Sequence, residues 1–139
     1  MVRDWNSGII EEFRSNEGQV GGPFEGRPIL LLHHRGAKTG TERVNPLAYR
    51  KVGEAFAVFA SKGGSPTNPD WYHNLVANPQ ARIEVGADII DVVARVAEGE
   101  ERHRIWADQT RDIPVFSEYQ RRSGRAIPVV VLEPVNARV

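Results

Sequence analysis

Apolar positions gather in short runs along the chain, and their spacing changes from one run to the next. The first run, within residues 3–16, recurs at helical spacing and predicts an amphipathic helix; its apolar members are Trp5, Ile9, Ile10 and Phe13. Four glycines between 18 and 26 then predict a loop. We therefore expect two parts, an N-terminal helix with a glycine-rich linker over 1–25 and a main domain over 26–139.

The main domain alternates short apolar segments with turn residues. Residues 28–34 are almost wholly apolar, which is typical of a buried strand rather than of a helix. Further strands are expected at residues 42–51, 55–60, 81–85, 89–97 and 127–132. Five or six short strands joined by tight turns favour an antiparallel barrel, a mainly β or α+β fold, with helices at its periphery.

Two further helices are expected. One should begin near Asn68 or Asp70, either of which could cap it, and should end at about residue 76. The other should cover about 98–112. Residues 113–124 fit neither a helical nor a strand period, so the pattern leaves them unassigned.

Composition narrows the class of protein. The 139 residues suffice for one core, and the absence of cysteine excludes disulfides, thiolate metal sites and a catalytic thiol. The first residues lack the apolar stretch of a signal peptide and no run is long enough to span a membrane, so we expect a cytoplasmic protein. The apolar helix face leaves peripheral membrane attachment open, with packing on the barrel as the alternative.

Charge is balanced overall but uneven along the chain. The 18 basic and 18 acidic residues give zero net charge, which argues against nucleic acid as a partner. Between Gly26 and Lys62, however, there are seven basic residues and two acidic ones, whereas nine acidic and four basic residues lie between Glu84 and Glu118. The basic segment predicts a specific anionic ligand, and a solvated charged surface is the alternative.

The turn Gly36-Ala-Lys-Thr-Gly is a candidate anion site. Its glycines allow backbone N–H groups to converge, while Lys38 adds a charge and Thr39 a hydroxyl donor. Arg43 lies further along the same predicted hairpin. The P-loop spacing is absent, and an ordinary glycine-rich hairpin would have the same composition.

A second small-residue loop, Ser61-Lys-Gly-Gly-Ser, could also present N–H groups to an oxyanion. The helix after it carries Trp71 and Tyr72, which either offer an aromatic surface to a planar ligand or fill the core. His33 and His34 are adjacent and should point to opposite faces of one strand. No metal-ligand spacing occurs, so no metal site is expected.

In their order and spacing these segments are similar to one family. They are the apolar strand before Arg35-Gly-Ala-Lys-Thr-Gly, then Arg43-Val-Asn-Pro-Leu-Ala-Tyr, Ala60-Ser-Lys-Gly-Gly, Asn68-Pro-Asp-Trp-Tyr-His-Asn-Leu-Val-Ala-Asn-Pro and the closing Ile127-Pro-Val-Val-Val-Leu-Glu-Pro. Over residues 28–134 the sequence resembles the deazaflavin-dependent nitroreductase family of actinobacteria.

The resemblance implies a split β-barrel, related to flavin-mononucleotide-binding reductases, and coenzyme F420 as the cofactor. Reduced F420 in that family gives hydride to nitroimidazoles, quinones such as menaquinone, or other electron-poor acceptors, and the protein mainly positions the two ligands. The resemblance therefore implies an F420H2-dependent oxidoreductase acting on a small molecule, as a monomer or homodimer. A non-catalytic F420 carrier and a flavin-mononucleotide-dependent oxidoreductase are the alternatives.

The matching positions imply roles for individual residues. The positions that match the family's cofactor site are Lys38, Thr39, Gly40 and Arg43 for the anionic tail, Asn45, Pro46 and Leu47 for the channel, Ala60, Ser61, Lys62 and Gly63 beside the ring, and Trp71, Tyr72 and Asn74 on the flanking helix. The expected substrate wall is Ala48, Ile113, Phe116 and Tyr119, with Ser61 and Tyr119 as candidate catalytic residues.

The chain departs from the family at the substrate wall. Members that activate nitroimidazoles often carry tyrosines where this sequence has Ala48, Ile113 and Phe116, and only Tyr119 is kept. Most of the phenol hydroxyls that could orient or protonate a substrate are therefore missing. This difference predicts a more apolar pocket, suited to a quinone rather than a nitroimidazole.

Overall fold

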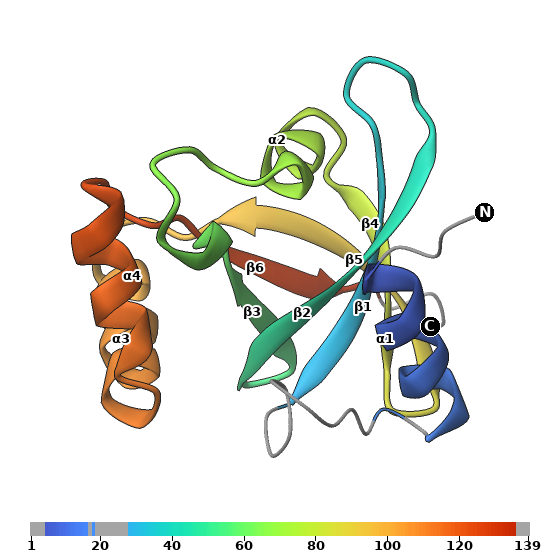
Figure 1. The fold of residues 1–139 in the computed structure, drawn as a ribbon, viewed down its shortest axis with the longest axis horizontal. Coiled ribbons are helices and arrows are strands. Elements are labelled where there is room, and N and C mark those ends of the chain that lie inside the picture. Colours follow the sequence, from blue (N-terminus) through green and yellow to red (C-terminus); the bar gives the residue numbers. More distant parts are fainter. Residues whose placement is uncertain (1–4, 17, 19–27, 136–139) are drawn as a thin grey trace.

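A computed structural model describes residues 5–16, 18 and 28–135, and the architecture within these residues is a closed six-stranded barrel with four helices around it (Figure 1). The strands follow one another around the barrel in the order β1-β2-β3-β6-β5-β4, and every neighbouring pair is antiparallel. Their bounds are β1 Ile29–Arg35, β2 Glu42–Val52, β3 Ala55–Phe59, β4 Gln80–Val85, β5 Asp88–Val96 and β6 Val129–Pro134. The split β-barrel expected from the sequence is thus confirmed.

Strand β1 is apolar throughout because both of its faces are covered. Leu30 and Leu32 point into the barrel interior, whereas Ile29 and Leu31 pack under the N-terminal helix α1 (Trp5–Ser15). All four leucine and isoleucine side chains are buried, which explains why the alternation typical of a half-exposed strand is missing.

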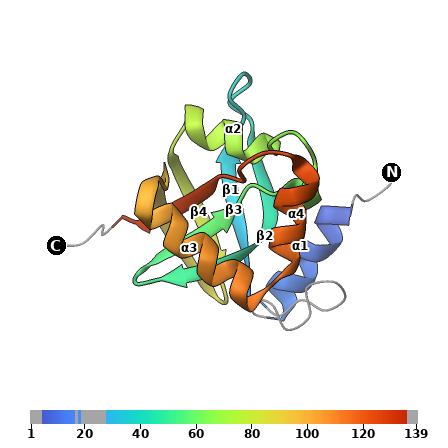
Figure 2. The same ribbon diagram turned by 90° about the vertical axis from the view of Figure 1, so that its left-hand side faces the viewer.

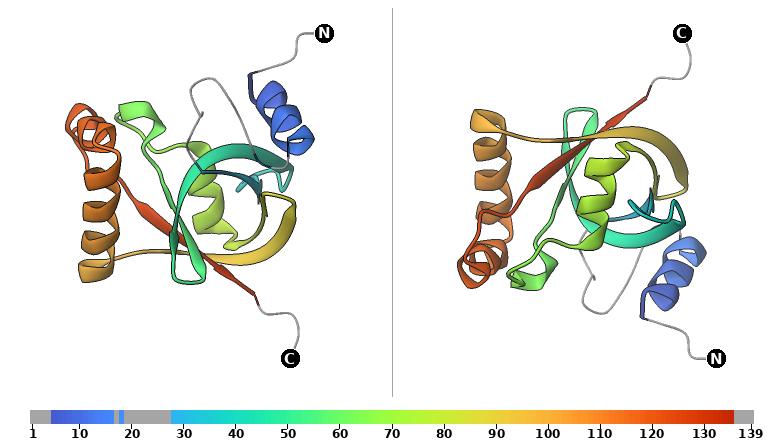
Figure 3. Two further views of the ribbon diagram at one scale, coloured as in Figure 1. Left: turned by 90° about the horizontal axis from the view of Figure 1, so that it is seen from below. Right: turned by 90° about the horizontal axis from the view of Figure 1, so that it is seen from above.

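The other helices cover two further parts of the barrel. Helices α3 (Gly99–Asp112) and α4 (Val115–Ser123) lie side by side over the outer face of β3 and β6, as Figure 2 shows. Helix α2 (Asp70–Ala77) closes one end of the barrel, and Figure 3 shows it across the opening, with α1 on one side and α3 on the other. This arrangement leaves the β1–β2 hairpin projecting beside α2 (Figure 1).

Two expectations about the helices require correction. Neither Asn68 nor Asp70 caps α2, because the helix begins directly after Pro69 and has no side-chain cap. The Asn68 Oδ1 atom instead accepts a hydrogen bond from Arg125. Residues 113–124, left unassigned by the pattern, contain α4, which follows Pro114 and ends at Gly124 in the left-handed conformation (φ 69°).

Candidate functional site

The predicted anion turn and the start of α2 together form a cleft of about 390 Å³. Within the turn the Gly36 N–H donates to the Thr41 carbonyl (2.9 Å), and Gly40 has φ 72°, which favours glycine. The residues around the cleft are Gly36, Ala37, Lys38, Thr39, Arg43, Asp70, His73 and Asn74. Folding thus brings together the predicted tail-binding residues Lys38, Thr39 and Arg43, while Gly40 completes the turn.

A chain of hydrogen bonds fastens this turn to the barrel. The Ala37 N–H donates to Asn74 Oδ1 (2.9 Å), and Asn74 Nδ2 donates to His34 Nδ1 (3.0 Å). His34 Nε2 in turn donates to Asn45 Oδ1 (2.7 Å). Because Nδ1 accepts and Nε2 donates, the ring is the neutral Nε2–H tautomer. Asn45 and Asn74, expected beside the cofactor, therefore use their amides to hold the turn.

Burial keeps the central histidine of this chain neutral. The His34 side chain is 2% exposed, and its desolvation lowers the pKa of the imidazole below its usual value. The hydrogen bond to Asn45 opposes this shift, while the charge of Arg43 adds to it. His33 lies on the opposite face of β1, as predicted, and sequence reasoning assigned no role to His34.

The second predicted loop forms a short 3-10 turn, η2 (Lys62–Gly64), after the buried Ala60 and the half-buried Ser61. Lys62 has φ 48° and is the one non-glycine residue with positive φ among those the structure describes. Such a conformation costs free energy and persists only where the surroundings impose it. Gly63 lies within this turn, and Gly64 (φ 90°) sits against the Arg122 side chain of α4.

Sequence reasoning missed Arg125, which lies between α4 and β6 and reaches the whole loop. Its guanidinium donates to Ser65 O (3.2 Å), Asn68 Oδ1 (2.5 Å), Ala60 O (3.1 Å), Ser61 O (3.4 Å) and Thr67 O (2.9 Å). These partners lie more than 55 residues earlier in the chain. No local pattern could reveal this contact, because the arginine resembles its surface neighbours in sequence.

The predicted aromatic and channel residues belong mostly to the barrel interior. Trp71 is buried in the main core, where Leu47, Ala60 and the half-buried Tyr72 also pack. Packing is thus the role that the structure shows for Trp71. Pro46 lies half-buried in β2, opposite Leu31 of β1.

The expected substrate wall is divided between two clusters. Ile113, Phe116 and Tyr119 pack together over β3, and the Phe116 ring lies 5.3 Å from that of Tyr119 and 5.5 Å from that of Phe59. Ala48 instead packs beside α1 on the outer face of β2. The structure therefore brings three of the four residues together on α4 and the residues just before it, and α4 also contacts η2.

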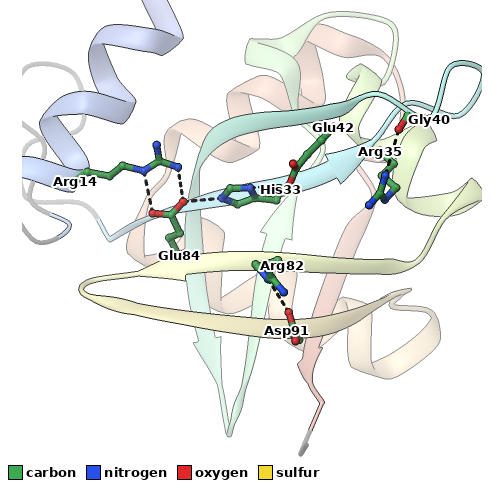
Figure 4. A network of polar contacts seen from close by, with 8 residues as sticks. All are labelled: Arg14, His33, Arg35, Gly40, Glu42, Arg82, Glu84 and Asp91. Atoms are coloured by element: carbon green, nitrogen blue, oxygen red, sulfur yellow. Dashed lines mark hydrogen bonds and ion pairs between the residues drawn. The ribbon is translucent and has the colours of Figure 1, made fainter.

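Helix α1 is fixed to the barrel by apolar packing and by a polar network (Figure 4). Ile9 and Phe13 are buried against Ile29 and Leu31. Arg14 forms an ion pair with Glu84 of β4 (2.6 Å). The Glu84 carboxylate also contacts His33 Nε2 (2.6 Å). The hydrogen bond from Arg14 lowers the pKa of the Glu84 carboxyl.

Two kinds of feature are absent from the described residues. No helix there is both long enough and apolar enough to cross a membrane. No group of three or more histidine or acidic side chains in the described part of the chain is arranged to hold a metal ion.

A family model described as F420H(2)-dependent quinone reductase matches residues 7–134. The chain belongs to this family. It is similar to an F420H(2)-dependent quinone reductase of Mycobacterium tuberculosis, with 40% identity over 86% of this chain and 83% of that one. The family assignment confirms the enzyme class and the cofactor, reduced coenzyme F420.

Two solved structures give the same picture. One, described as an F420-H2 dependent reductase, is 41% identical and superposes with a TM-score of 0.70, covering 77% of this chain and 95% of that one. Another, described as a domain-swapped dimer, is 35% identical with a TM-score of 0.72, covering 94% of this chain and 98% of that one. The nitroreductase activity implied by the resemblance is not named by these relatives.

Proposed function

We propose that this F420H2-dependent oxidoreductase reduces a lipophilic quinone and holds the F420 tail in the cleft between the β1–β2 turn and α2. The observation that carries the proposal is the meeting of Lys38 and Arg43 in that cleft. These cations come from opposite sides of one turn, and α2 begins beside them. Cations beside a helix N-terminus suit phosphate and carboxylate groups.

The donors in the cleft match the chemistry of the tail. Thr39 Oγ1 accepts from the Thr41 N–H (3.2 Å), so its hydroxyl hydrogen is directed elsewhere and can reach an anion. Lys38 and Arg43 are exposed, so they lose little hydration before a ligand binds. Among the described residues that line the cleft, Asp70 is the one acidic residue, and its charge opposes the same ligand.

The loop from Ala60 to Gly63 is the proposed ring site. Bound reduced F420 supplies the hydride, and the residues of this chain orient the ring and exclude water. We propose that peptide N–H groups of this loop bond the ring carbonyl oxygens. The half-buried Ser61 hydroxyl then lies where it can donate to an oxygen that becomes negative in the acceptor.

The acceptor is proposed to lie against α4. Ile113 and Phe116 offer an apolar wall, and Tyr119 is the one phenol among them. Ser61 and Tyr119 are the proposed hydroxyl donors to the acceptor. An apolar wall with few hydroxyls favours a lipophilic quinone over a more polar nitroimidazole.

Two assays test the proposed cofactor and acceptor. Titration of the protein with F420 and with flavin mononucleotide, followed by fluorescence, should show tight binding of F420 alone. Decay of F420H2 absorbance should be faster with menadione than with a nitroimidazole. Preferred binding of flavin mononucleotide would support the flavin alternative, and F420 binding without turnover would support a carrier.

The site of the tail is tested by Lys38→Ala with Arg43→Ala. Each cation makes a charge-assisted contact, so the double variant should weaken F420 binding by about 10- to 100-fold. The matched control is Arg82→Ala, which removes an exposed cation paired with Asp91 on β4 and β5. Unchanged F420 affinity in the double variant would refute this placement.

For the assembly and location, we propose a monomer whose α1 packs on its own barrel. The buried Ile9 and Phe13 are then unavailable to a lipid surface, so we propose no membrane attachment through these side chains. The homodimer remains the alternative that the swapped relative favours. Sedimentation velocity at several concentrations distinguishes the two, because a dimer sediments faster.

A further inference from the structure

We propose that Arg125 is a positioning residue that fixes the loop from Ala60 to Asn68 in the shape that binds the cofactor ring. The inference rests on the proposed position of the ring. Arg125 does not need to touch either ligand, since it acts through the loop. Three observations carry it: the set of loop oxygens it binds, the direction these bonds impose on peptide N–H groups, and the way its own backbone is held.

All the hydrogen bonds found for the guanidinium go to one loop. Nε donates to Ser65 O, Nη1 to Asn68 Oδ1, and Nη2 to the carbonyls of Ala60, Ser61 and Thr67. Four of these five acceptors are backbone carbonyls, which depend on the path of the chain rather than on side-chain identity. A single side chain thus joins the two ends of a nine-residue loop.

The bonds to Ala60 and Ser61 also orient the peptide groups that follow. In a trans peptide the carbonyl of one residue and the N–H of the next point in opposite directions. Because both carbonyls face Arg125, the N–H groups of Ser61 and Lys62 must face away from it. These are two of the N–H groups proposed to bond the ring, so Arg125 sets the direction of the donors without contributing one.

The same arrangement explains the strained residue in the loop. Lys62 has φ 48°, which a lysine adopts only when its surroundings enforce it. The Ser61 carbonyl before it accepts from Arg125 and also from the Gly64 N–H (3.0 Å). Fixing the peptide on the N-terminal side of Lys62 is therefore one source of the constraint.

Arg125 is itself rigidly placed. The Ser123 hydroxyl donates to the Gln120 carbonyl (2.9 Å) and accepts from the Arg125 N–H (3.2 Å), and Gly124 reverses the chain with φ 69°. The next strand begins at Val129, after the buried Ile127. The arginine thus projects from the junction of α4 and β6, two elements that pack on the same core cluster.

Lysine cannot replace this arginine. The guanidinium has five N–H donors in a fixed plane, whereas an ammonium has three donors around one point. Acceptors that lie around a planar group, as these do, are out of reach of one ammonium. The variant Arg125→Lys therefore keeps the charge and removes the geometry, which makes it a sharper test than alanine.

The test compares Arg125→Lys and Arg125→Ala with the control Arg121→Ala. Arg121 lies on α4, is exposed and pairs with Glu118, so its loss removes an arginine close in sequence that does not reach the loop. Amide hydrogen exchange of residues 60–68 is measured without cofactor, and F420 affinity is measured by fluorescence. Melting temperature reports on the rest of the fold.

In Arg125→Lys we expect exchange of residues 60–68 to be at least about tenfold faster, with exchange in the barrel strands unchanged. F420 affinity should fall about tenfold, as expected for loss of oriented donors. Millimolar guanidinium should restore much of the affinity of Arg125→Ala, because it fills the space left by the side chain. The control should match wild type in every measurement.

Loop exchange and F420 affinity equal to those of Arg121→Ala would overturn the inference. Faster loop exchange with unchanged affinity would also overturn it, and would place the error in the proposed ring position. The dependence on F420 is tested separately, by titration of the wild-type protein. If Arg125→Ala does not fold, the lysine variant still decides between these outcomes.

Discussion

His34 shows how one neutral side chain can organise a charged site. It accepts from Asn74 and donates to Asn45, and Asn74 holds the Ala37 N–H of the anion turn. A protonated ring would carry a second donor and would lose the acceptor that Asn74 needs. The chain of bonds therefore depends on the neutral form, which burial favours by lowering the pKa.

This dependence predicts a loss of stability in mild acid. The unfolded chain protonates His34 near pH 6.5, whereas the native state resists protonation, so the unfolded state binds more protons as pH falls below 6.5. The free energy of unfolding should therefore fall by up to about 1.4 kcal/mol per pH unit between pH 6.5 and the native pKa. Urea unfolding at several pH values measures it.

The variant His34→Gln should reduce that slope, since glutamine does not titrate and keeps a donor for Asn45. Exposed His103 on α3 provides the control His103→Gln, which should retain the wild-type slope. Protonation of the carboxyl groups with lowered pKa, Glu84, Glu101 and Asp112, destabilises the protein only at more acidic pH and does not interfere. An unchanged slope in His34→Gln would contradict the assignment of the effect to His34.

Replacing Asp70 should increase the affinity for F420. Asp70 is the first residue of α2 and lines the cleft together with Lys38 and Arg43. Asp70→Asn removes a charge of the same sign as the F420 tail, so affinity should rise by about two- to fivefold at low salt. Fluorescence titration measures this, with Asp88→Asn at the β4–β5 turn as control. Weaker binding in Asp70→Asn would show that the tail lies elsewhere.

At the scale of elements, α1 packs directly on the outer surface of the barrel. Phe13 is fully buried against Ile29 and Leu31, while Arg14 binds Glu84 on another strand. The division at residue 25 stays a prediction, because residues 19–25 lie outside the described part of the chain. The packing nevertheless indicates that α1 contributes to the stability of the barrel.

Phe13→Ala tests that contribution. Removing a buried phenylalanine leaves a cavity, so the free energy of unfolding should fall by about 3–5 kcal/mol. F420 affinity should stay within about twofold of wild type, since the cleft lies at the other end of β1. Urea unfolding and fluorescence titration measure the two quantities. Half-buried Ile10 provides a comparison, and Ile10→Ala should lower the free energy of unfolding by less than Phe13→Ala does.

A stability loss below about 1 kcal/mol in Phe13→Ala would mean that α1 is docked only weakly. A large loss of F420 affinity, with the variant still folded, would instead place α1 at the ligand site. Either result would also bear on truncation of residues 1–25, which we expect to destabilise the barrel more than it weakens cofactor binding.

The strands and three of the helices were predictable because each carries a local period. The apolar run at 28–34 marks β1, and the spacing of Ile9 and Phe13 marks α1. Helix α4 was missed although Pro114 and Gly124 bracket it, because its sequence contains no long apolar stripe. The few residues that it buries pack against β3 and α3. Tertiary contacts determine such an element more than its own sequence does.

The candidate site was predictable where its residues are close in sequence. Lys38, Thr39 and Arg43 share one hairpin, and the structure places all three at one cleft. The contacts that support the site connect distant segments, as His34 does with Asn74, and Arg125 with Ala60. A lone histidine or arginine carries no signal of such a partner, so only the fold reveals these roles.

At the scale of the whole molecule, the zero net charge conceals an unequal distribution. The β1–β2 turn, which carries the basic residues, projects at one end of the barrel beside α2 (Figure 1). The apolar residues of α4 pack over β3, on the side of the barrel. In the proposed arrangement F420 uses the basic turn for its anionic tail and the loop of η2 for its ring, whereas the acceptor uses the apolar residues of α4. Salt should therefore affect the two ligands differently.

Raising the ionic strength from about 50 mM to about 500 mM should weaken F420 binding roughly tenfold, because Lys38 and Arg43 are exposed and their attraction is screened. The KM for menadione should change by less than about twofold over the same range, since its contacts are apolar. Steady-state kinetics with each ligand varied in turn measure both. In the variant lacking both cations the salt dependence of F420 binding should largely disappear, and its persistence would show that other charges hold the tail.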